Sequence, residues 1–302
     1  MNICFILLLR EGFYLLIGVE ERFFDFLLDI TPFYHYTVKI MRALIYSIAN
    51  QKGGVGKTTT SLCLGAALTE KGQKVLLVDL DPQAGLTTSL GFNPDSFDTT
   101  IYNALINPEG VTLKNIIKET KVNKLLFAPS NIDLAGAEGE LIGEIGWDRN
   151  LKEVLSAVVK EYDFILVDCP PSLGVLTTNA LIASDRVIIP VQTEYLALRG
   201  LKHLNEIIAK VKRKGNSKLT AKILRTMHDI RTVHSKEVVE ELEKIFHDQN
   251  YNTIIKRTIK FADATLTGES ILSYAKNSEG AMAYRNLARE VLKDGKKTDI
   301  KR

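Results

Sequence analysis

Residues 50–62 read "NQKGGVGKTTTSL", a glycine-rich turn that contains a lysine and is followed by three threonines. The run "RALIYSIAN" leads into this turn and has the apolar, β-branched character of a buried strand. A helical pattern follows over residues 58–71. Glycines let backbone N–H groups turn inward around an anion, and a helix N-terminus adds partial positive charge. The stretch therefore predicts a phosphate-binding loop between a strand and a helix.

The lysines of this turn have an unusual spacing. In the general pattern G-x-x-x-x-G-K-[ST], read back from Gly56-Lys57-Thr58, the first glycine falls at Gln51. The sequence is instead K-G-G-V-G-K-T-T, the deviant Walker A form, with an additional lysine at Lys52. We expect Lys57 to reach the β- and γ-phosphates of a nucleotide and the Thr58 hydroxyl to coordinate Mg²⁺. The alternative is an ordinary glycine-rich turn between a strand and a helix.

Carboxylates stand at the ends of two further predicted strands. In "VLLVDLDPQ", Asp79 and Asp81 are two residues apart, so both side chains leave the same side of the strand. In "DFILVDCPPS", four apolar residues precede Asp168, as in a Walker B motif, which predicts a magnesium ligand, direct or through water. The carboxyl ends of strands in an open α/β sheet face the ligand crevice. The alternative for the first pair is that it caps a turn before Pro82.

The rest of the chain alternates short β-branched runs with longer helical patterns. Several of the runs are apolar throughout, as expected of strands that are covered on both faces. We expect strands at 43–49, 74–80, 124–129, 163–169, 186–191, 221–227 and 252–256, and helices at 58–71, 150–161, 199–213 and 235–247. Repeated β-α units predict an α/β fold with a doubly wound, mainly parallel sheet. We interpret residues 41–295 as one P-loop NTPase domain, followed by a polar tail at 296–302.

The first forty residues differ from the others in composition. Their apolar runs are short and are interrupted by charges, whereas a helix that spans a bilayer needs roughly twenty apolar residues. They also lack the basic segment and the cleavage site of a signal peptide. Because Met41 stands directly before the first predicted strand, we interpret residues 1–40 as an N-terminal extension that is spurious or unstructured. The alternatives are an amphipathic membrane-surface segment and a packed arm.

The composition indicates a soluble globular protein whose positive charge is unevenly distributed. Of 302 residues, 45% are hydrophobic and 25% charged, and the three cysteines form no C-x-x-C pair. A disulfide framework or zinc site is therefore not expected, and a reducing cytoplasm fits better. Residues 199–260 carry 15 Lys and Arg against 7 Asp and Glu, although the whole chain has a net charge of only +3. This excess favours a polyanionic partner, with a solvated lysine face as the alternative.

The motifs "KGGVGKTT", "DLDPQ" and "VDCPPS" together resemble those of the ParA/MinD class of P-loop ATPases. Further stretches resemble the Soj-type chromosome-partitioning ATPases in particular: "TIYNAL" (100–105), "NIDLAGAEGEL" (131–141), "DCPPSLGVLTTNAL" (168–181), "IPVQTEYLALRGL" (189–201) and "GAMAYRNLAREV" (280–291). The resemblance covers nearly all of residues 41–295.

The resemblance implies ATP and Mg²⁺ as cofactors and hydrolysis of ATP to ADP and phosphate. It implies a nucleotide loop made of Lys52, Gly53, Gly54, Val55, Gly56, Lys57, Thr58 and Thr59. In this family the early lysine, here Lys52, reaches across a dimer interface to the partner's nucleotide. Asp81 is implied to position or activate the attacking water, and Asp79 to support the magnesium shell.

The resemblance also implies adenine and DNA contacts. The family segment I-P-R-N-V-R-L-S-E-A reads "IKRTIKFADA" in this chain, and it implies adenine contacts near Met227, Lys256 and Thr258. Arg231 and Lys260 match positions that contact DNA non-specifically. Lys260 replaces an arginine, which keeps the charge needed for phosphate contact but loses the planar fork.

The implied mechanism is a switch. ATP and Mg²⁺ fill two facing sites, the homodimer closes and binds non-specific DNA, and hydrolysis stimulated by a DNA-bound, ParB-like partner releases it. We therefore expect a cytoplasmic protein, nucleoid-associated in its ATP form and without stable membrane association. The alternatives are a MinD-like, membrane-cycling ATPase, which would need an amphipathic C-terminal helix, and a nucleotide-binding scaffold without turnover.

Overall fold

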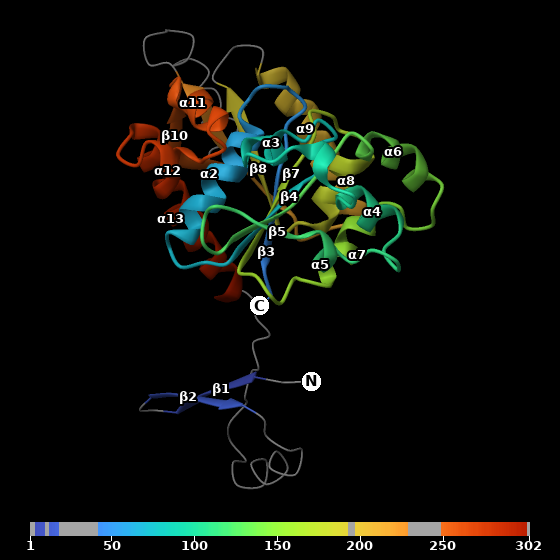
Figure 1. The fold of residues 1–302 in the computed structure, drawn as a ribbon, viewed down its shortest axis with the longest axis horizontal. Helices are drawn as coiled ribbons and strands as arrows, with labels where there is room; N and C mark the ends of the chain where they lie inside the picture. The colour runs from blue at the N-terminus through green and yellow to red at the C-terminus, as the bar shows by residue number, and fades with distance from the viewer. Residues whose placement is uncertain (1–3, 10–11, 18–41, 193–196, 229–248, 301–302) are drawn as a thin grey trace. The chain divides into compact units, whose positions relative to one another are not determined.

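A computed structural model of the chain describes residues 4–9, 12–17, 42–192, 197–228 and 249–300 (Figure 1). Two units are distinguished, Met1–Met41 and Arg42–Arg302. In the first, β1 (Cys4–Leu9) and β2 (Gly12–Ile17) form an antiparallel hairpin with Leu9 opposite Gly12. This hairpin was not among the predicted elements. The interpretation of residues 1–40 as a spurious or unstructured extension stays a prediction.

The second unit is built on an eight-stranded sheet with the order β10-β9-β8-β3-β7-β4-β6-β5. The strands are β3 (Leu44–Ile48), β4 (Val75–Asp79), β5 (Lys118–Glu119), β6 (Leu125–Ala128), β7 (Phe164–Asp168), β8 (Arg186–Gln192), β9 (Thr220–His228) and β10 (Asn250–Lys256). All neighbours pair in parallel except β5 and β6, which are antiparallel. The predicted doubly wound, mainly parallel sheet is confirmed, and each of the seven predicted strands is present.

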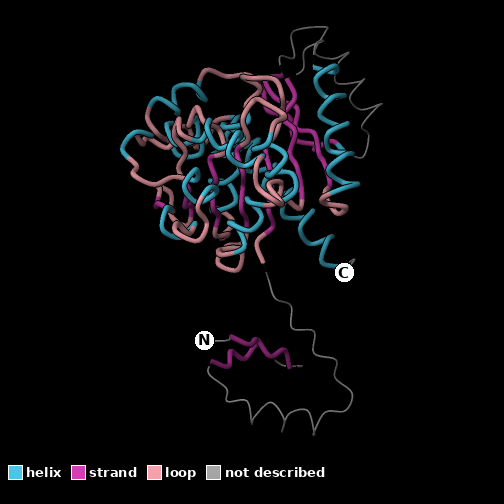
Figure 2. The backbone as a smooth tube through the Cα atoms, turned by 90° about the vertical axis from the view of Figure 1, so that its right-hand side faces the viewer, coloured by secondary structure: helices cyan, strands magenta, loops and turns pink. Residues whose placement is uncertain are grey.

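Helices cover both faces of this sheet (Figures 1 and 2). They are α2 (Lys57–Thr69), α3 (Gly85–Ser89), α4 (Ile101–Ile106), α5 (Leu113–Ile116), α6 (Leu134–Ile142), α7 (Asn150–Ser156), α8 (Val175–Ala183), α9 (Ala197–Lys214), α11 (Lys260–Leu266), α12 (Ile271–Tyr274) and α13 (Glu279–Ile300), with a short 3₁₀ turn at Pro94–Ser96. None of the helices that the structure describes combines the length and the apolar character needed to cross a bilayer.

The predicted helices at 58–71 and 199–213 are confirmed with small shifts of their ends. The helix predicted at 150–161 is shorter, because α7 ends at Ser156 and the chain continues in turns. There the Val159 carbonyl accepts a hydrogen bond from the Ala43 N–H (2.7 Å), which ties the turn to the start of β3. The helix predicted at 235–247 lies outside the described residues. Helix α13 continues to Ile300, through most of the segment that was expected to be a polar tail.

Successive side chains of each strand enter two separate cores, one on each face of the sheet. In β4, Leu76 and Val78 pack on the face covered by α4 to α9, whereas Val75 and Leu77 pack against α2 and α13. Helix α2 lies close to the sheet at Gly65, where a Cβ atom would be 2.8 Å from Leu77 Cδ2. Because both faces are covered, the strands are apolar at consecutive positions, which is why their sequences do not alternate.

A close backbone contact joins the turn after α3 to the turn after α11. Gly91 and Gly268 have positive φ angles of 85° and 69°, and a Cβ atom on Gly268 would lie 2.8 Å from Gly91 Cα. Neither backbone can move aside as a flexible side chain could. The contact therefore requires glycine at position 268 for two reasons, its φ angle and its lack of a side chain.

We expect Gly268→Ala to lower the free energy of unfolding by about 2–4 kcal/mol, through backbone strain plus steric overlap. Urea unfolding followed by circular dichroism measures the loss. Gly72→Ala is the matched control, because Gly72 also has a positive φ (85°) but a Cβ atom on it would meet no other atom within 4 Å. The control should lose only about 1–2 kcal/mol from strain. Equal losses in the two variants would contradict the role given to the Gly91 contact.

Candidate nucleotide-binding site

Three loops meet at the carboxyl edge of the sheet, where β3, β7 and β4 are neighbours. The last residue of β7, Asp168, pairs with Ile48 at the end of β3 on one side and with Asp79 at the end of β4 on the other. The glycine-rich loop follows β3, so it lies beside both carboxylates. The parallel sheet thus brings together three motifs that are far apart in the sequence, at the edge where open α/β folds bind their ligands.

Hydrogen bonds from the sheet hold the glycine-rich loop in place. Asn50 Nδ2 donates to the Pro190 carbonyl in β8 (2.7 Å), and Asn50 Oδ1 accepts from the Lys52 N–H (3.0 Å). At the other side of the loop, Thr226 Oγ1 in β9 donates to the Val55 carbonyl (2.8 Å). These bonds connect the loop to two strands, so its shape is set before any ligand binds.

The backbone of the loop suits an anion. Gly54 and Gly56 have positive φ angles of 71° and 91°, and Gly56 directly precedes the first residue of α2. Among the residues that the structure describes, no side chain caps this helix N-terminus, so its first N–H groups are available to phosphate oxygens. Gly53 is exposed and Thr59 is half-buried. The nucleotide contacts expected of these residues stay predictions.

Lys57, at the first position of α2, has a buried side chain that is only 7% exposed. Its Nζ atom donates to the Lys52 carbonyl at 3.3 Å. Burial lowers the pKa of Lys57, while the nearby Asp168 carboxylate acts in the opposite direction. An ammonium group taken out of water in this way interacts strongly with any phosphate that enters the loop.

Asp168 is fully buried and carries an unsatisfied oxygen. Its Oδ1 atom accepts from Ser61 Oγ (3.0 Å), whereas Oδ2 accepts no hydrogen bond within the described part of the chain. Burial raises the pKa of Asp168 to about 8 and Asp79 adds to this, while hydrogen bonding by Thr58 and Ser61 acts in the other direction. An unpaired carboxylate oxygen next to a threonine hydroxyl fits Mg²⁺ that is shared with a bound phosphate.

Magnesium in such a site depends on the phosphate for some of its ligands. The described residues contain no cluster of three or more His, Cys, Asp or Glu side chains that could hold a metal ion. Thr58 and Asp168 carry oxygen donors that fit the ion, and their role as its ligands stays a prediction.

The raised pKa of Asp168 predicts an unusual pH dependence of stability. Because the folded pKa (about 8) exceeds the ordinary value of 3.8, the folded chain binds the proton more tightly, so nucleotide-free stability falls as pH rises between these values. Asp168→Asn removes this loss and should raise the melting temperature at pH 8 by about 2–4 °C, which corresponds to about 1 kcal/mol.

Differential scanning fluorimetry without nucleotide, at pH 5 and pH 8, measures this effect. The gain of Asp168→Asn over the unmodified chain should be larger at pH 8 than at pH 5. An equal gain at the two pH values would show that Asp168 is already ionised in the folded chain at pH 5, and would contradict the prediction.

The carboxylates after β4 have different environments. Asp79 is fully buried: its Oδ2 atom accepts from Thr87 N–H and Thr87 Oγ1 (both 2.8 Å), and its Oδ1 atom accepts from Asp81 N–H (3.2 Å). Burial raises the pKa of Asp79 to about 6. Asp81 is half-buried, and its Oδ1 atom accepts from Gln83 N–H (2.9 Å). Asp79 thus fixes the turn that carries Asp81. The magnesium role of Asp79 and the water-activating role of Asp81 stay predictions.

Three hydroxyl residues of this site were not identified from the sequence. Ser61 binds Asp168, Thr87 binds Asp79, and Ser130 Oγ donates to the Asp81 carbonyl at 2.8 Å. They come from α2, α3 and the segment after β6. Helices α2 and α3 each contain several serines and threonines, and Ser130 stands in a polar segment with no motif of its own, so only the folded arrangement distinguishes these three.

Lys52 lies against its own subunit. Its Nζ atom donates to Gln192 Oε1 at the end of β8 (3.1 Å), and the residue is half-buried. To act on a partner's nucleotide, the side chain has to leave this position. Its role across a dimer interface stays a prediction.

The expected adenine contacts lie at the same edge of the sheet. Met227 is half-buried near the end of β9 with a positive φ of 50°, and Lys256 at the end of β10 pairs with His228 of β9. Lys256 Nζ forms an ion pair with Glu279 (3.0 Å), so it is engaged within the subunit. Thr258 Oγ1 accepts from Lys260 N–H at 3.4 Å. The structure places Met227 and Lys256 at the ends of the neighbouring strands β9 and β10, with Thr258 just after β10, and the contact of these three residues with adenine stays a prediction.

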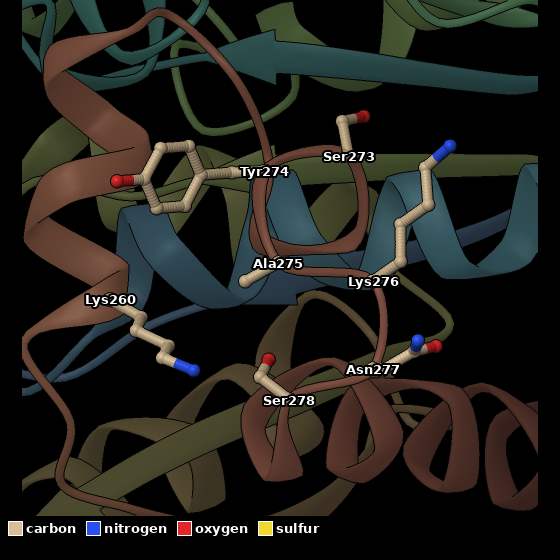
Figure 3. A pocket seen from close by; sticks show the side chains of 7 residues that line it. All are labelled: Lys260, Ser273, Tyr274, Ala275, Lys276, Asn277 and Ser278. Carbon is tan, nitrogen blue, oxygen red and sulfur yellow. The ribbon is translucent and has the colours of Figure 1, made fainter.

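Lys260, the first residue of α11, borders a surface pocket of about 450 Å³ (Figure 3). The other lining residues run from Ser273 to Ser278, that is, from the end of α12 to the residue before α13. Both Lys260 and Lys276 are exposed, and Lys276 is a cation that the sequence analysis did not identify. Ser278 Oγ accepts from Ala281 N–H (3.2 Å) at the start of α13. Two exposed lysines thus border the pocket, with their ammonium groups on opposite sides of it in Figure 3. The other expected DNA contact, Arg231, lies outside the described residues.

The cysteines of the second unit do not offer a nucleophile. Cys63 and Cys169 are free and buried. Burial raises the pKa of Cys63 to about 12 and raises that of Cys169 as well. Neither thiol ionises near neutral pH, so the chemistry of this site depends on its lysines, hydroxyls and carboxylates.

Comparison with known proteins identifies the family of this chain. Residues 43–221, more than half of the chain, match the AAA domain family. The Bacillus subtilis sporulation initiation inhibitor protein Soj is 46% identical over 252 residues, which cover 83% of this chain and 99% of that protein. The chromosome-partitioning ATPase Soj of Treponema pallidum is 42% identical over 250 residues, covering 82% and 97%.

A solved structure from Mycobacterium smegmatis, named cobyrinic acid a,c-diamide synthase, is 38% identical with a TM-score of 0.72 and covers 84% of this chain and 96% of its own. That protein holds ADP and magnesium. The fold, the deviant Walker A loop and the near-complete coverage of the Soj relatives lead to one conclusion. The chain belongs to the Soj/ParA family of chromosome-partitioning ATPases.

Proposed function

We propose that this chain is an ATP-dependent DNA-partitioning ATPase controlled by nucleotide-driven dimerisation. The observation that carries the proposal is that a buried Lys57 ammonium and the unsatisfied Oδ2 atom of Asp168 occur at the same site, beside a helix N-terminus with no side-chain cap among the described residues. An ammonium group, a free carboxylate oxygen and a helix N-terminus together accommodate a triphosphate with magnesium. The related M. smegmatis protein holds ADP with magnesium.

The residues of the loop bind and orient the nucleotide. Lys57 exchanges the Lys52 carbonyl for phosphate oxygens, and Thr58 and Asp168 hold the magnesium ion. That ion, when bound, neutralises phosphate charge during hydrolysis. Asp168 must release its proton on binding, because its pKa of about 8 keeps it largely neutral in the nucleotide-free chain near pH 7. Asp81, on a turn fixed by Asp79, orients the attacking water.

Dimerisation completes the site. Two nucleotide-loaded subunits close face to face about a twofold axis, and each Lys52 leaves Gln192 to contact the phosphates bound by its partner. A cation that arrives in this way stabilises the charge that develops during hydrolysis, as an arginine finger does. Because Lys52 acts only across the interface, closure and hydrolysis are linked.

The closed dimer is the form that binds DNA. Lys260 and Lys276 provide exposed ammonium groups on each subunit, and such contacts bind phosphates without reading bases. Hydrolysis, stimulated by a ParB-like partner on its own DNA, opens the dimer and releases it. The ATP form is then nucleoid-associated and the released form cytoplasmic. The names of the Soj and ParA relatives, which refer to chromosome partitioning, support this proposal.

Co-sedimentation with non-specific duplex DNA tests the proposal. The assay is run with ATP, with ADP and without nucleotide, each with Mg²⁺ and at two salt concentrations. We expect retention only with ATP, and weaker retention at the higher salt because phosphate contacts release counterions. Equal retention under the three nucleotide conditions would contradict the switch.

The double variant Lys260→Glu/Lys276→Glu should weaken DNA retention and reduce its salt dependence. Loss of two phosphate contacts per subunit lowers the slope of log affinity against log salt by about 0.9 for each contact. Fluorescence anisotropy of a labelled duplex, with ATP present, measures both quantities. Lys152→Glu/Lys160→Glu is the control with the same charge change at exposed positions on and after α7. If both variants lose affinity equally, only net charge matters and the pocket is not the contact.

A further inference from the structure

Helix α6 has one buried side and one uncovered apolar side. Leu134, Ala137 and Leu141 are buried in the core. The opposite side carries an exposed series at helical spacing, which we call the α6 face: Ile132, Ala135, Gly136, Gly139 and Ile142, extended by Ile145 after the helix. Ile132 and Ile142 are each 60% exposed and Ile145 is fully exposed. Three exposed isoleucines on one short segment are a feature of interaction sites rather than of free surface.

Acidic side chains surround the α6 face. Asp133, Glu140 and Glu144 are exposed next to it, and residues 131–148 contain five Asp and Glu but no Lys or Arg. The glycines let another chain approach the helix closely, the isoleucines offer apolar contact, and the carboxylates attract positive charge. These properties together fit a basic amphipathic segment.

A second copy of this chain does not fit the α6 face. Contact about a twofold axis would set the same surface of both subunits together, so the acidic rim would face itself. Like charges brought together in this way disfavour the pairing. The occupant is therefore a segment of a different protein.

Helix α6 is connected to the two acidic loops of the nucleotide site. Ser130, which precedes it, donates its hydroxyl to the Asp81 carbonyl (2.8 Å) and its N–H to Thr87 Oγ1 (3.1 Å). Within the helix, Glu138 Oε1 accepts from Leu176 N–H (3.5 Å) at the start of α8, the helix that follows the Asp168 loop. Hydrogen bonds of Ser130 therefore link the segment that leads into α6 to the Asp81 turn.

We propose that the α6 face docks a basic amphipathic segment of a partner protein, and that docking alters hydrolysis through the contact between Ser130 and Asp81. This inference rests on the proposed function and extends it, because it names the surface at which the stimulating partner binds. Helix α6 follows β6 near one edge of the sheet, whereas α11 with Lys260 follows β10 at the other (Figure 1). The segment therefore docks without covering the DNA-binding pocket.

Stimulation of hydrolysis is the first readout. Full-length chain with Mg·ATP and duplex DNA is titrated with the purified ParB-like protein of the same organism. In Ile142→Ser/Ile145→Ser, basal hydrolysis and DNA retention should be unchanged, and the half-maximal partner concentration should rise about 30-fold or more. Glu140→Lys/Glu144→Lys should act in the same direction. The control Leu266→Ser/Met282→Ser alters exposed apolar residues on α11 and α13 and should respond like the unmodified chain.

The emission of Trp147, the only tryptophan of the chain, is the second readout. This residue is half-buried two positions after Ile145, so docking of a tryptophan-free fragment of the partner should change its emission. The change should be lost in Ile142→Ser/Ile145→Ser. It should persist in Ser130→Ala, which keeps the α6 face but loses the hydrogen bond to Asp81 and should lose stimulation.

The outcomes separate the two proposals. An Ile142→Ser/Ile145→Ser variant stimulated at unchanged partner concentrations overturns the docking proposal. So does an unmodified chain that retains DNA with ATP but shows neither stimulation nor a change in Trp147 emission. Absence of ATP-dependent DNA retention in the unmodified chain overturns the proposed function instead.

Discussion

Lys52→Ala is expected to abolish ATP-dependent dimerisation and to leave a folded, nucleotide-binding monomer. The Lys52 side chain is half-buried and bonds Gln192 at the surface end of β8, so it has no part in either core. Within each subunit, the phosphates are bound by Lys57 and the loop backbone, which the substitution leaves in place. What is lost is the cation that the partner's phosphates require, and hydrolysis should fall about 10³-fold or more, as when an arginine finger is removed.

Size-exclusion chromatography with light scattering, in Mg·ATP and in Mg·ADP, measures this effect. Lys52→Arg is the matched control, because it keeps the charge and should keep part of the dimer. A second control is Lys71→Ala, an exposed lysine after α2. Normal dimerisation of Lys52→Ala, with hydrolysis within a few-fold of the unmodified chain, would rule out action across the interface.

Asp81→Ala is expected to have the opposite effect on the dimer. Removing the carboxylate that orients the water should slow hydrolysis by about 10²- to 10⁴-fold, the usual range for loss of a general base. Lys52, Lys57 and Asp168 remain, so ATP binding and closure remain. The ATP-bound dimer should therefore persist, and DNA retention should last longer.

Single-turnover phosphate release and the lifetime of the DNA complex measure the two parts of this prediction. Asp95→Ala, which removes an exposed carboxylate from the 3₁₀ turn Pro94–Ser96, is the control. Slow hydrolysis combined with loss of the dimer would instead show that Asp81 supports the interface. Unchanged hydrolysis would remove Asp81 from the reaction.

The sequence predicted the fold because its signals were local and strong. The strands of the parallel sheet are buried on both faces, so β4 and β7 appear as continuous apolar runs that end in carboxylates. The glycine-rich loop between β3 and α2 is equally local, since its function depends on consecutive backbone groups. These signals allowed the family, the sheet and the position of the site to be predicted, and the comparisons confirm the family.

Other features depend on residues that meet only after folding. Ser61, Thr87 and Ser130 have ordinary sequence surroundings, and each is distinguished only by the carboxylate or carbonyl that it bonds. Strand β5 has only two residues, which are too few to show an alternation of apolar and polar side chains. It forms by pairing with β6. Lys276 belongs to a polar turn that resembles many others in sequence, and only the folded arrangement shows that it lines the same pocket as Lys260 of α11 (Figure 3).

Sedimentation velocity of the unmodified chain with a fluorescently labelled duplex tests the central proposal most directly, because it reports protein mass and DNA binding together. With Mg·ATP, the protein should sediment at twice the mass of one chain and carry the duplex. With Mg·ADP, it should sediment as a single chain apart from the DNA. A single chain that carries the duplex equally well with either nucleotide would contradict the account.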